Sequence, residues 1–185
     1  MTTIELINDI MNKYYVTREI KNDVERNNTL KYNVALVQFN EAVDELINEI
    51  TFESVQNIIL TGFILNFFNK ENEKSLQKLL CLNFHKNHED IAGLFQRKFY
   101  NNLENISVLL QSLNNIPDYL SPEDFKYPYI RKIIYAIGAQ PEPYNIEALE
   151  KIANETEDEQ IKELALHQIK KRKEFGRWES AENIK

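Results

Sequence analysis

The sequence predicts an all-α protein built from stacked antiparallel helix pairs, about nine to ten helices in all. The clearest evidence is residues 127–173, where three short segments each repeat apolar residues at helical spacing. A short helix with one apolar stripe cannot bury that stripe alone, and tight loops favour antiparallel pairing with a neighbour. Gly (4) and Pro (5) are few among 185 residues, which leaves little room for a sheet of many short strands.

The three segments are separated by two turns and are followed by a tail, 174–185, that we expect to pack loosely. Gly138 is expected to end the first segment, because glycine commonly follows the last turn of a helix. The apolar stripes comprise Ile130, Ile133, Ile134 and Ile137 in the first segment, Ile146, Leu149, Ile152 and Ala153 in the second, and Ile161, Leu164, Ala165, Gln168 and Ile169 in the third.

Further helices are expected toward the N-terminus. A first helix capped by Thr2 or Thr3 should reach Tyr15, and weaker or longer patterns follow at 16–28 and 30–50. Residues 53–68 are apolar nearly all round, which is typical of a central helix. A short helix with Leu76, Leu79, Leu80 and Leu82 comes next, followed by helices at 88–99 and 103–115, the latter with Leu103, Ile106, Leu110 and Leu113 turned inward. Pro117, Pro122 and Pro128 predict a loop over 116–127.

The expected organisation is a single helical domain over residues 1–173. N-terminal helices occupy 1–50, and repeated helix pairs occupy 53–173, as units 53–82, 88–115 and 128–154, with the helix from 157 to 173 as a cap. A repeat period in this range, with atypical ends, is the pattern of a helical-repeat protein.

The net charge of the chain limits the kinds of partner that it is expected to bind. The formal net charge is −7, with an isoelectric point near 5.1. A nucleic-acid-binding protein needs Lys and Arg to neutralise phosphates, so we expect no nucleic-acid partner. Acidic charge suits a free protein or one with a basic partner.

Other segments indicate a cytoplasmic protein with no membrane partner. The most apolar run, 55–68, is interrupted by Asn57, Gly62 and Asn66 and is shorter than the ~20 residues a membrane span requires. The N-terminus carries acidic residues early and lacks a signal pattern. The single cysteine, Cys81, is expected to be a small core residue in a reducing compartment.

Residues in two parts of the sequence resemble a known class of helical-repeat protein. Ala136-Ile137-Gly138 and Glu147-Ala148-Leu149 stand where HEAT repeats carry the end of one helix and the body of the next. The phrase Phe84-His85, then His88-Glu89-Asp90-Ile91, resembles small bacterial HEAT-like proteins, over roughly residues 75–172. Several members of that class accompany polymorphic or contact-dependent toxins, so the resemblance implies an immunity protein that binds a toxin domain.

The phrase His85-x-x-His88-Glu89-Asp90 is the one pattern that suggests chemistry. Two imidazoles and two carboxylates can bind a divalent metal or supply a general base. However, a zinc-peptidase helix spaces its histidines by four residues, whereas these are three apart across a loop and a helix start. The favoured interpretation places Glu89 and Asp90 in the first turn of a helix, where carboxylates interact well with its dipole. His85 and His88 therefore remain weak metal candidates, and no cofactor is expected.

Topology predicts an acidic edge. In stacked helix pairs the loops 83–87, 116–127 and 154–157 lie on one edge, together with the helix starts that follow them. Tyrosines there are candidate anchors for a partner, and carboxylates speed association with a basic one. The candidate partner-binding residues are Glu89, Asp90, Asp118, Tyr119, Glu123, Asp124, Tyr127, Glu157 and Asp158.

These observations favour a non-catalytic binding protein over an enzyme. The leading hypothesis is an immunity protein that neutralises a toxin domain, such as a basic nuclease, by stoichiometric occlusion. The alternatives are an adaptor or scaffold for another cytosolic protein, a helical-repeat metal hydrolase that uses the His-Glu-Asp phrase, and a DNA glycosylase. A glycosylase requires a basic concave face, which an acidic chain does not favour.

Overall fold

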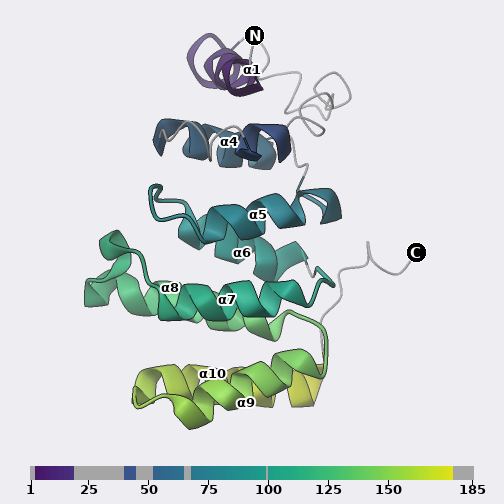
Figure 1. Cartoon of the computed structure of the whole chain (residues 1–185), viewed down its shortest axis with the longest axis vertical. Coiled ribbons are helices and arrows are strands. Elements are labelled where there is room, and N and C mark those ends of the chain that lie inside the picture. Colours follow the sequence, from purple (N-terminus) through teal and green to yellow (C-terminus); the bar gives the residue numbers. More distant parts are fainter. Residues whose placement is uncertain (1–2, 19–39, 45–51, 65–67, 99, 177–185) are drawn as a thin grey trace. The chain divides into compact units, whose positions relative to one another are not determined.

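The computed structural model describes residues 3–18, 40–44, 52–64, 68–98 and 100–176, and these are helical with connecting turns and contain no strand (Figure 1). The all-α prediction is confirmed for this part of the chain. The chain divides into two compact units, Met1–Asn87 and His88–Lys185. Whether the helices form the single domain expected over 1–173 stays a prediction.

Unit 1 contains α1 (Thr3–Met11), which continues into a π-helical turn (Asn12–Val16), together with α4 (Phe52–Ile64), a 3-10 turn (Lys70–Asn72) and α5 (Glu73–Leu80). Helix α1 packs against α4, and Asn57 Nδ2 donates to Asn8 Oδ1 at 2.8 Å. A helical segment at 40–44 meets the start of α5, where Ser75 Oγ donates to Asn40 Oδ1 at 2.6 Å.

Several expectations for unit 1 need correction. The described part of α4 runs from Phe52 to Ile64, and Phe63 within it is 36% exposed, so α4 is not buried all round. The buried Phe68 ring lies against Gly62. Cys81 follows the last turn of α5 and is exposed, because the buried face of α5 is formed by Leu76, Leu79 and Leu80. Most of the helices expected at 16–28 and 30–50, and residues Thr2, Leu65 and Phe67, lie outside the described residues.

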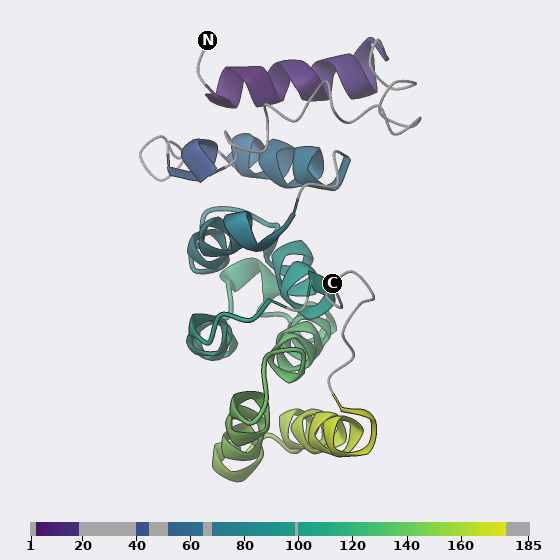
Figure 2. The ribbon, with the colours of Figure 1, turned by 90° about the vertical axis from the view of Figure 1, so that its right-hand side faces the viewer.

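Unit 2 contains α6 (His88–Lys98), α7 (Glu104–Asn114), the 3-10 turn η4 (Asp118–Leu120), α8 (Glu123–Gly138), α9 (Tyr144–Glu155) and α10 (Glu159–Phe175). Figure 2 views these helices nearly end-on, with α6, α8 and α10 in one layer and α7 and α9 beside them. Helix α8 contacts all four of the others and is the centre of the unit. Its predicted stripe, Ile130, Ile133, Ile134 and Ile137, is fully buried, and the helix ends at Gly138 as expected.

The predicted loop over 116–127 is wrong. It contains η4 and the first turn of α8, and Pro128 lies inside that helix. Pro122, in an extended conformation, precedes the helix, and the amides of Phe125 and Lys126 both donate to its carbonyl at 2.9 Å. Proline lacks an N–H, so Pro128 leaves the carbonyl of Asp124 without its helical donor. The cost is small there because Asp124 lies in an exposed first turn that water can reach.

Helix α7 buries a different stripe from the one expected. Leu103 precedes the helix and is 45% exposed, while Leu109 is fully buried between Asn105 and Ser112. The helix is rotated because Asn105 faces inward, where its Nδ2 donates to Gln140 Oε1 at 3.0 Å. The other expected core residues of α7 are half-buried: Ile106, Leu110 and Leu113.

The last two helices follow their predicted patterns closely. Leu149, Ile152 and Ala153 are buried in α9, and Ala165, Gln168 and Ile169 are buried in α10. The remaining residues of the two predicted stripes are half-buried: Ile146, Ile161 and Leu164. Helix α10 extends to Phe175, so the first residues of the predicted tail are helical, and the cations Arg172 and Lys173 stand in its last turn. None of the described helices is both long and apolar enough to cross a membrane.

Candidate functional site

The start of α6 is held by a buried histidine. His88 begins the helix, as predicted, and is fully buried. Its Nδ1 lies 3.0 Å from the hydroxyl oxygen of Tyr119 in η4, and its ring stands edge-on to Tyr129 at 6.4 Å. Burial raises the pKa of Tyr119 to about 12, with a further contribution from the charges of Glu89 and Asp90. Four predicted residues, His88, Glu89, Asp90 and Tyr119, are therefore neighbours.

The two carboxylates at this point have different surroundings. Glu89 Oε1 lies 3.1 Å from Lys132 Nζ of α8, in a half-exposed ion pair. Asp90 is exposed, and so is Asp118 in η4. Half-exposed pairs contribute little to stability, so Glu89 remains able to exchange Lys132 for another cation.

A second group of contacts joins the start of α8 to the start of α10. The Tyr127 hydroxyl donates to Asp158 Oδ2 at 2.9 Å. Asp158 is the N-cap of α10, where its Oδ1 accepts from the amides of Gln160 at 3.0 Å and Ile161 at 3.2 Å. Desolvation raises the pKa of Asp158, but the hydrogen bonds from Ile161, Tyr127 and Gln160 outweigh it, so its pKa is lowered. The hydrogen bond to Asp158 in turn raises the pKa of Tyr127.

The predicted acidic residues are thus divided between two groups, at α6–η4 and at α8–α10. Figure 1 shows the starts of α8 and α10 on the same side of unit 2. Among the described residues, several exposed carboxylates at these positions make no ion pair: Asp90, Asp118, Glu123, Asp124, Glu155 and Glu157. We call the exposed carboxylates Asp90, Asp118, Glu123, Asp124 and Glu157, together with the half-buried Asp158, the acidic edge.

One exposed aromatic residue on this edge was missed. Phe125 lies in the first turn of α8, directly after Glu123 and Asp124, and is 56% exposed. The sequence alone placed it in a loop. Its position in a helix that buries Tyr129 and Ile130 could have been recognised by extending the helical pattern back to residue 123.

His85 is a structural residue of unit 1. It is buried, its Nε2 lies 2.7 Å from the carbonyl oxygen of Leu79, and its Nδ1 accepts from the Asn87 amide at 3.1 Å. Desolvation lowers the pKa of His85. Both ring nitrogens are engaged by the backbone, so metal binding by His85 requires these bonds to break. No group of three His, Cys, Asp or Glu side chains suited to a metal occurs among the described residues.

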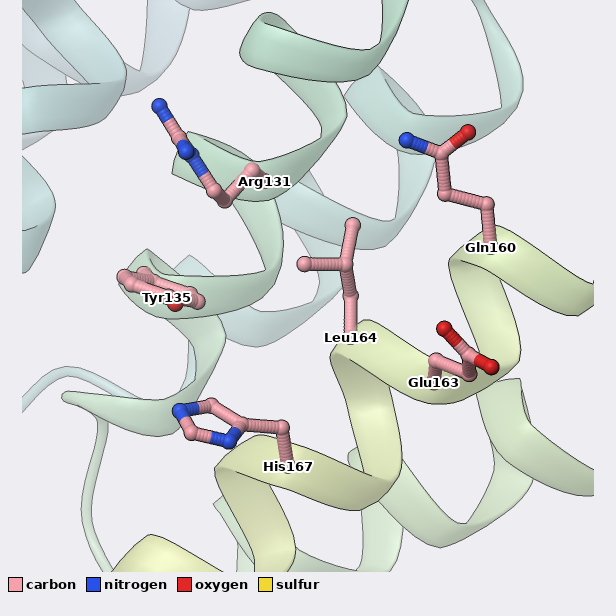
Figure 3. Close-up of a pocket in the computed structure, with 6 residues that line it drawn as sticks. All are labelled: Arg131, Tyr135, Gln160, Glu163, Leu164 and His167. Carbon is pink, nitrogen blue, oxygen red and sulfur yellow. The ribbon is translucent and has the colours of Figure 1, made fainter.

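A groove runs between α8 and α10, and Figure 3 shows its wider part. This part has a volume of about 430 Å³ and is lined by Arg131, Tyr135, Gln160, Glu163, Leu164 and His167. A hollow of about 230 Å³ shares Arg131, Gln160 and Leu164 with it and extends to Tyr127 and Pro128. The groove therefore begins beside Asp158, at the acidic edge.

Comparison with known proteins gives no match among family models, curated proteins or solved structures.

Proposed function

We propose that this chain is a non-catalytic immunity protein, a HEAT-like stack of antiparallel helix pairs that neutralises a toxin domain by binding it. The toxin's surface is occluded in a one-to-one complex, so inhibition needs no turnover. The support is the state of the predicted functional residues: His85 in unit 1 and His88 in unit 2 are both engaged in hydrogen bonds, whereas the carboxylates of the acidic edge other than Asp158 are exposed.

The observation that carries the proposal is the exposed Phe125 next to Glu123 and Asp124. Aromatic anchors supply much of the binding energy of protein interfaces, and charges around them steer association and select the partner. A charged edge with an apolar residue in it therefore suits a basic protein surface that contains an apolar hollow. A nuclease domain has such a basic surface, because it must hold phosphates.

Charge reversal tests this proposal. The protein encoded beside this gene is expressed with and without the chain in a growth assay, and the purified pair is titrated by calorimetry. Glu123→Lys with Asp124→Lys should slow association roughly tenfold at low salt and weaken its salt dependence, since steering depends on these charges. Phe125→Ser should mainly speed dissociation.

A matched control exists on the same unit. Glu104 and Glu147 are exposed and lie in the first turns of α7 and α9, as Glu123 and Asp124 do in α8. Glu104→Lys with Glu147→Lys changes the net charge equally and disturbs two helix starts, yet should leave association within about twofold, apart from the general effect of net charge. Equal slowing by both pairs would show that only net charge matters and would sink the acidic edge. Absence of rescue and of binding would leave the adaptor hypothesis.

A further inference from the structure

The groove between α8 and α10 is open along its length. Its floor is apolar, from Leu164, Pro128 and the rings of Tyr127 and Tyr135, and its rim is polar, from Arg131, Gln160 and Glu163. Sites for small molecules enclose most of the ligand surface. An open trough with an apolar floor and a polar rim fits a chain segment laid along it.

The length of the groove limits that segment. Tyr127 and Tyr135 are eight residues apart on α8, which is about 12 Å at 1.5 Å per residue. About four residues of an extended chain span this distance.

One end of the groove is negative. Tyr127 donates to Asp158, and the charges of Asp158 and Glu123 both act on its hydroxyl. Lys126 also lies here, with Nζ 5.3 Å from the centroid of the Tyr127 ring. The three carboxylates of Glu123, Glu157 and Asp158 outnumber Lys126 and Arg131, so a cation is favoured at this end.

The other end is positive. The His167 ring stacks on Tyr135, with centroids 6.5 Å apart, and Lys171 Nζ lies 5.9 Å from the Tyr135 centroid. Arg131, midway between Tyr127 and Tyr135 on α8, lines both parts of the groove. Within the described residues, Arg131 and Lys171 make no ion pair, while Glu163 stands on the opposite wall from Arg131 (Figure 3). A carboxylate is therefore favoured between Arg131 and Lys171.

We propose that this groove holds an extended segment of the protein partner, with lysine or arginine at the Tyr127 end and aspartate or glutamate at the Tyr135 end. The inference rests on the proposed function, because it names the part of the partner that enters the binding surface. Burial of the segment's middle residues on Leu164 supplies affinity, and the two opposite charges fix its direction.

Capped hexapeptides test the groove without the partner. The full chain, labelled with ¹⁵N, is titrated with Lys-Lys-Leu-Tyr-Glu-Glu and with two controls, Lys-Lys-Leu-Tyr-Lys-Lys and Glu-Glu-Leu-Tyr-Glu-Glu. The mixed peptide should shift the amides of Arg131, Tyr135 and Leu164 and bind roughly two- to tenfold tighter than either control, the range expected of exposed charge contacts. Tightest binding of the all-lysine peptide would overturn the inference, since net charge alone would explain it. So would unchanged amides in α8 and α10.

A charge-reversed groove gives the second test. Arg131 and Lys171 are both exposed, so Arg131→Glu with Lys171→Glu should fold normally. Both ends are then negative, and the preference should move from the mixed peptide to the all-lysine peptide. An unchanged preference would reject the groove assignment.

The two proposals fail separately. If this variant rescues growth and binds the toxin like the unaltered chain, the groove inference is wrong and the immunity function stands. If the mixed peptide binds in the groove but no toxin is neutralised, the function is wrong and the groove still takes a segment of this charge pattern.

Discussion

The two ends of α8 have opposite surroundings. Just after its last turn, Gln140 is fully buried, with its Oε1 accepting from Asn105 and its Nε2 donating to the carbonyls of Ala136 at 2.9 Å and Phe95 at 3.4 Å. Asn145 is also buried there and donates to the carbonyl of Gly138 at 3.1 Å. At its first turn, Glu123, Asp124 and Phe125 are exposed.

This difference means that the residues that stabilise unit 2 and the residues proposed to bind a partner lie at opposite ends of α8. A buried polar group that loses its partner costs its full desolvation, about 1–3 kcal/mol, whereas an exposed charge contributes at most about 1 kcal/mol. Changes to the buried amides just after α8 should therefore destabilise unit 2, and changes at the first turn of α8 should alter binding with little effect on folding. The 16-residue helix, about 24 Å long, keeps the two ends apart.

The largest expected effect is that of Gln140→Ala. It removes the hydrogen bonds of a buried amide and leaves Asn105 and two backbone carbonyls without that partner, so the free energy of unfolding should fall by about 2–4 kcal/mol. Urea denaturation measures the change, at constant slope. The exposed Gln160 is the control, and Gln160→Ala should cost under about 0.5 kcal/mol. Similar losses of unfolding free energy in the two variants would show that the buried amide of Gln140 has no special role in stability.

A smaller loss is expected for Tyr119→Phe, which lies near the acidic edge but contacts a buried group. Removing the hydroxyl takes one hydrogen bond from the buried His88, at a cost of about 1–2 kcal/mol. Urea denaturation of both proteins at neutral pH measures it.

The same variant changes the response to alkali. Burial raises the pKa of Tyr119 from 10.0 to about 12, so folding favours the neutral phenol. This contribution to stability is complete below the unfolded pKa, about 10, and is lost as the pH rises through about 12. Tyr119→Phe should therefore lose less stability than the unaltered chain over this range. If the free energy of unfolding falls equally in both proteins as the pH rises, another group governs alkaline unfolding.

Helical spacing was enough to predict the elements with a single apolar face. The stripe of α8 from Ile130 to Ile137 and the start of α6 at His88 agree with the structure. The pattern failed where a polar residue faces inward or a proline lies in a helix. Asn105 is buried because Gln140, 35 residues later, supplies its partner, and spacing within α7 carries no information about that contact.

The residues of the candidate site were predictable from the sequence, but the contacts between them were not. Acids at helix starts follow from the dipole, so Glu89, Asp90 and Asp158 could be placed from the sequence. The contact between Tyr127 and Asp158 joins residues 31 apart and depends on how α8 lies against α10. Phe125 was missed because proline at 122 and 128 suggested a loop, whereas a helix places it on the surface.

The smallest expected effect is that of Asp158→Ala, which removes the N-cap of α10 and the acceptor of the Tyr127 hydroxyl. Loss of a cap typically costs about 1 kcal/mol, and Asp158→Asn, which retains a capping oxygen, should cost less.

The folded pKa of Asp158 is lowered from its ordinary 3.8, so folding favours the carboxylate. The charged contribution is present above about pH 4 and disappears as the pH falls through the folded pKa. The difference in thermal midpoint between the unaltered chain and Asp158→Asn should therefore narrow on acidification from neutral pH to about pH 2.5. A difference that stays constant over this range would mean that the charge of Asp158 adds nothing to the stability of the cap. The contact between the starts of α8 and α10 would then depend on hydrogen bonds alone, as does the contact around Gln140 just after α8.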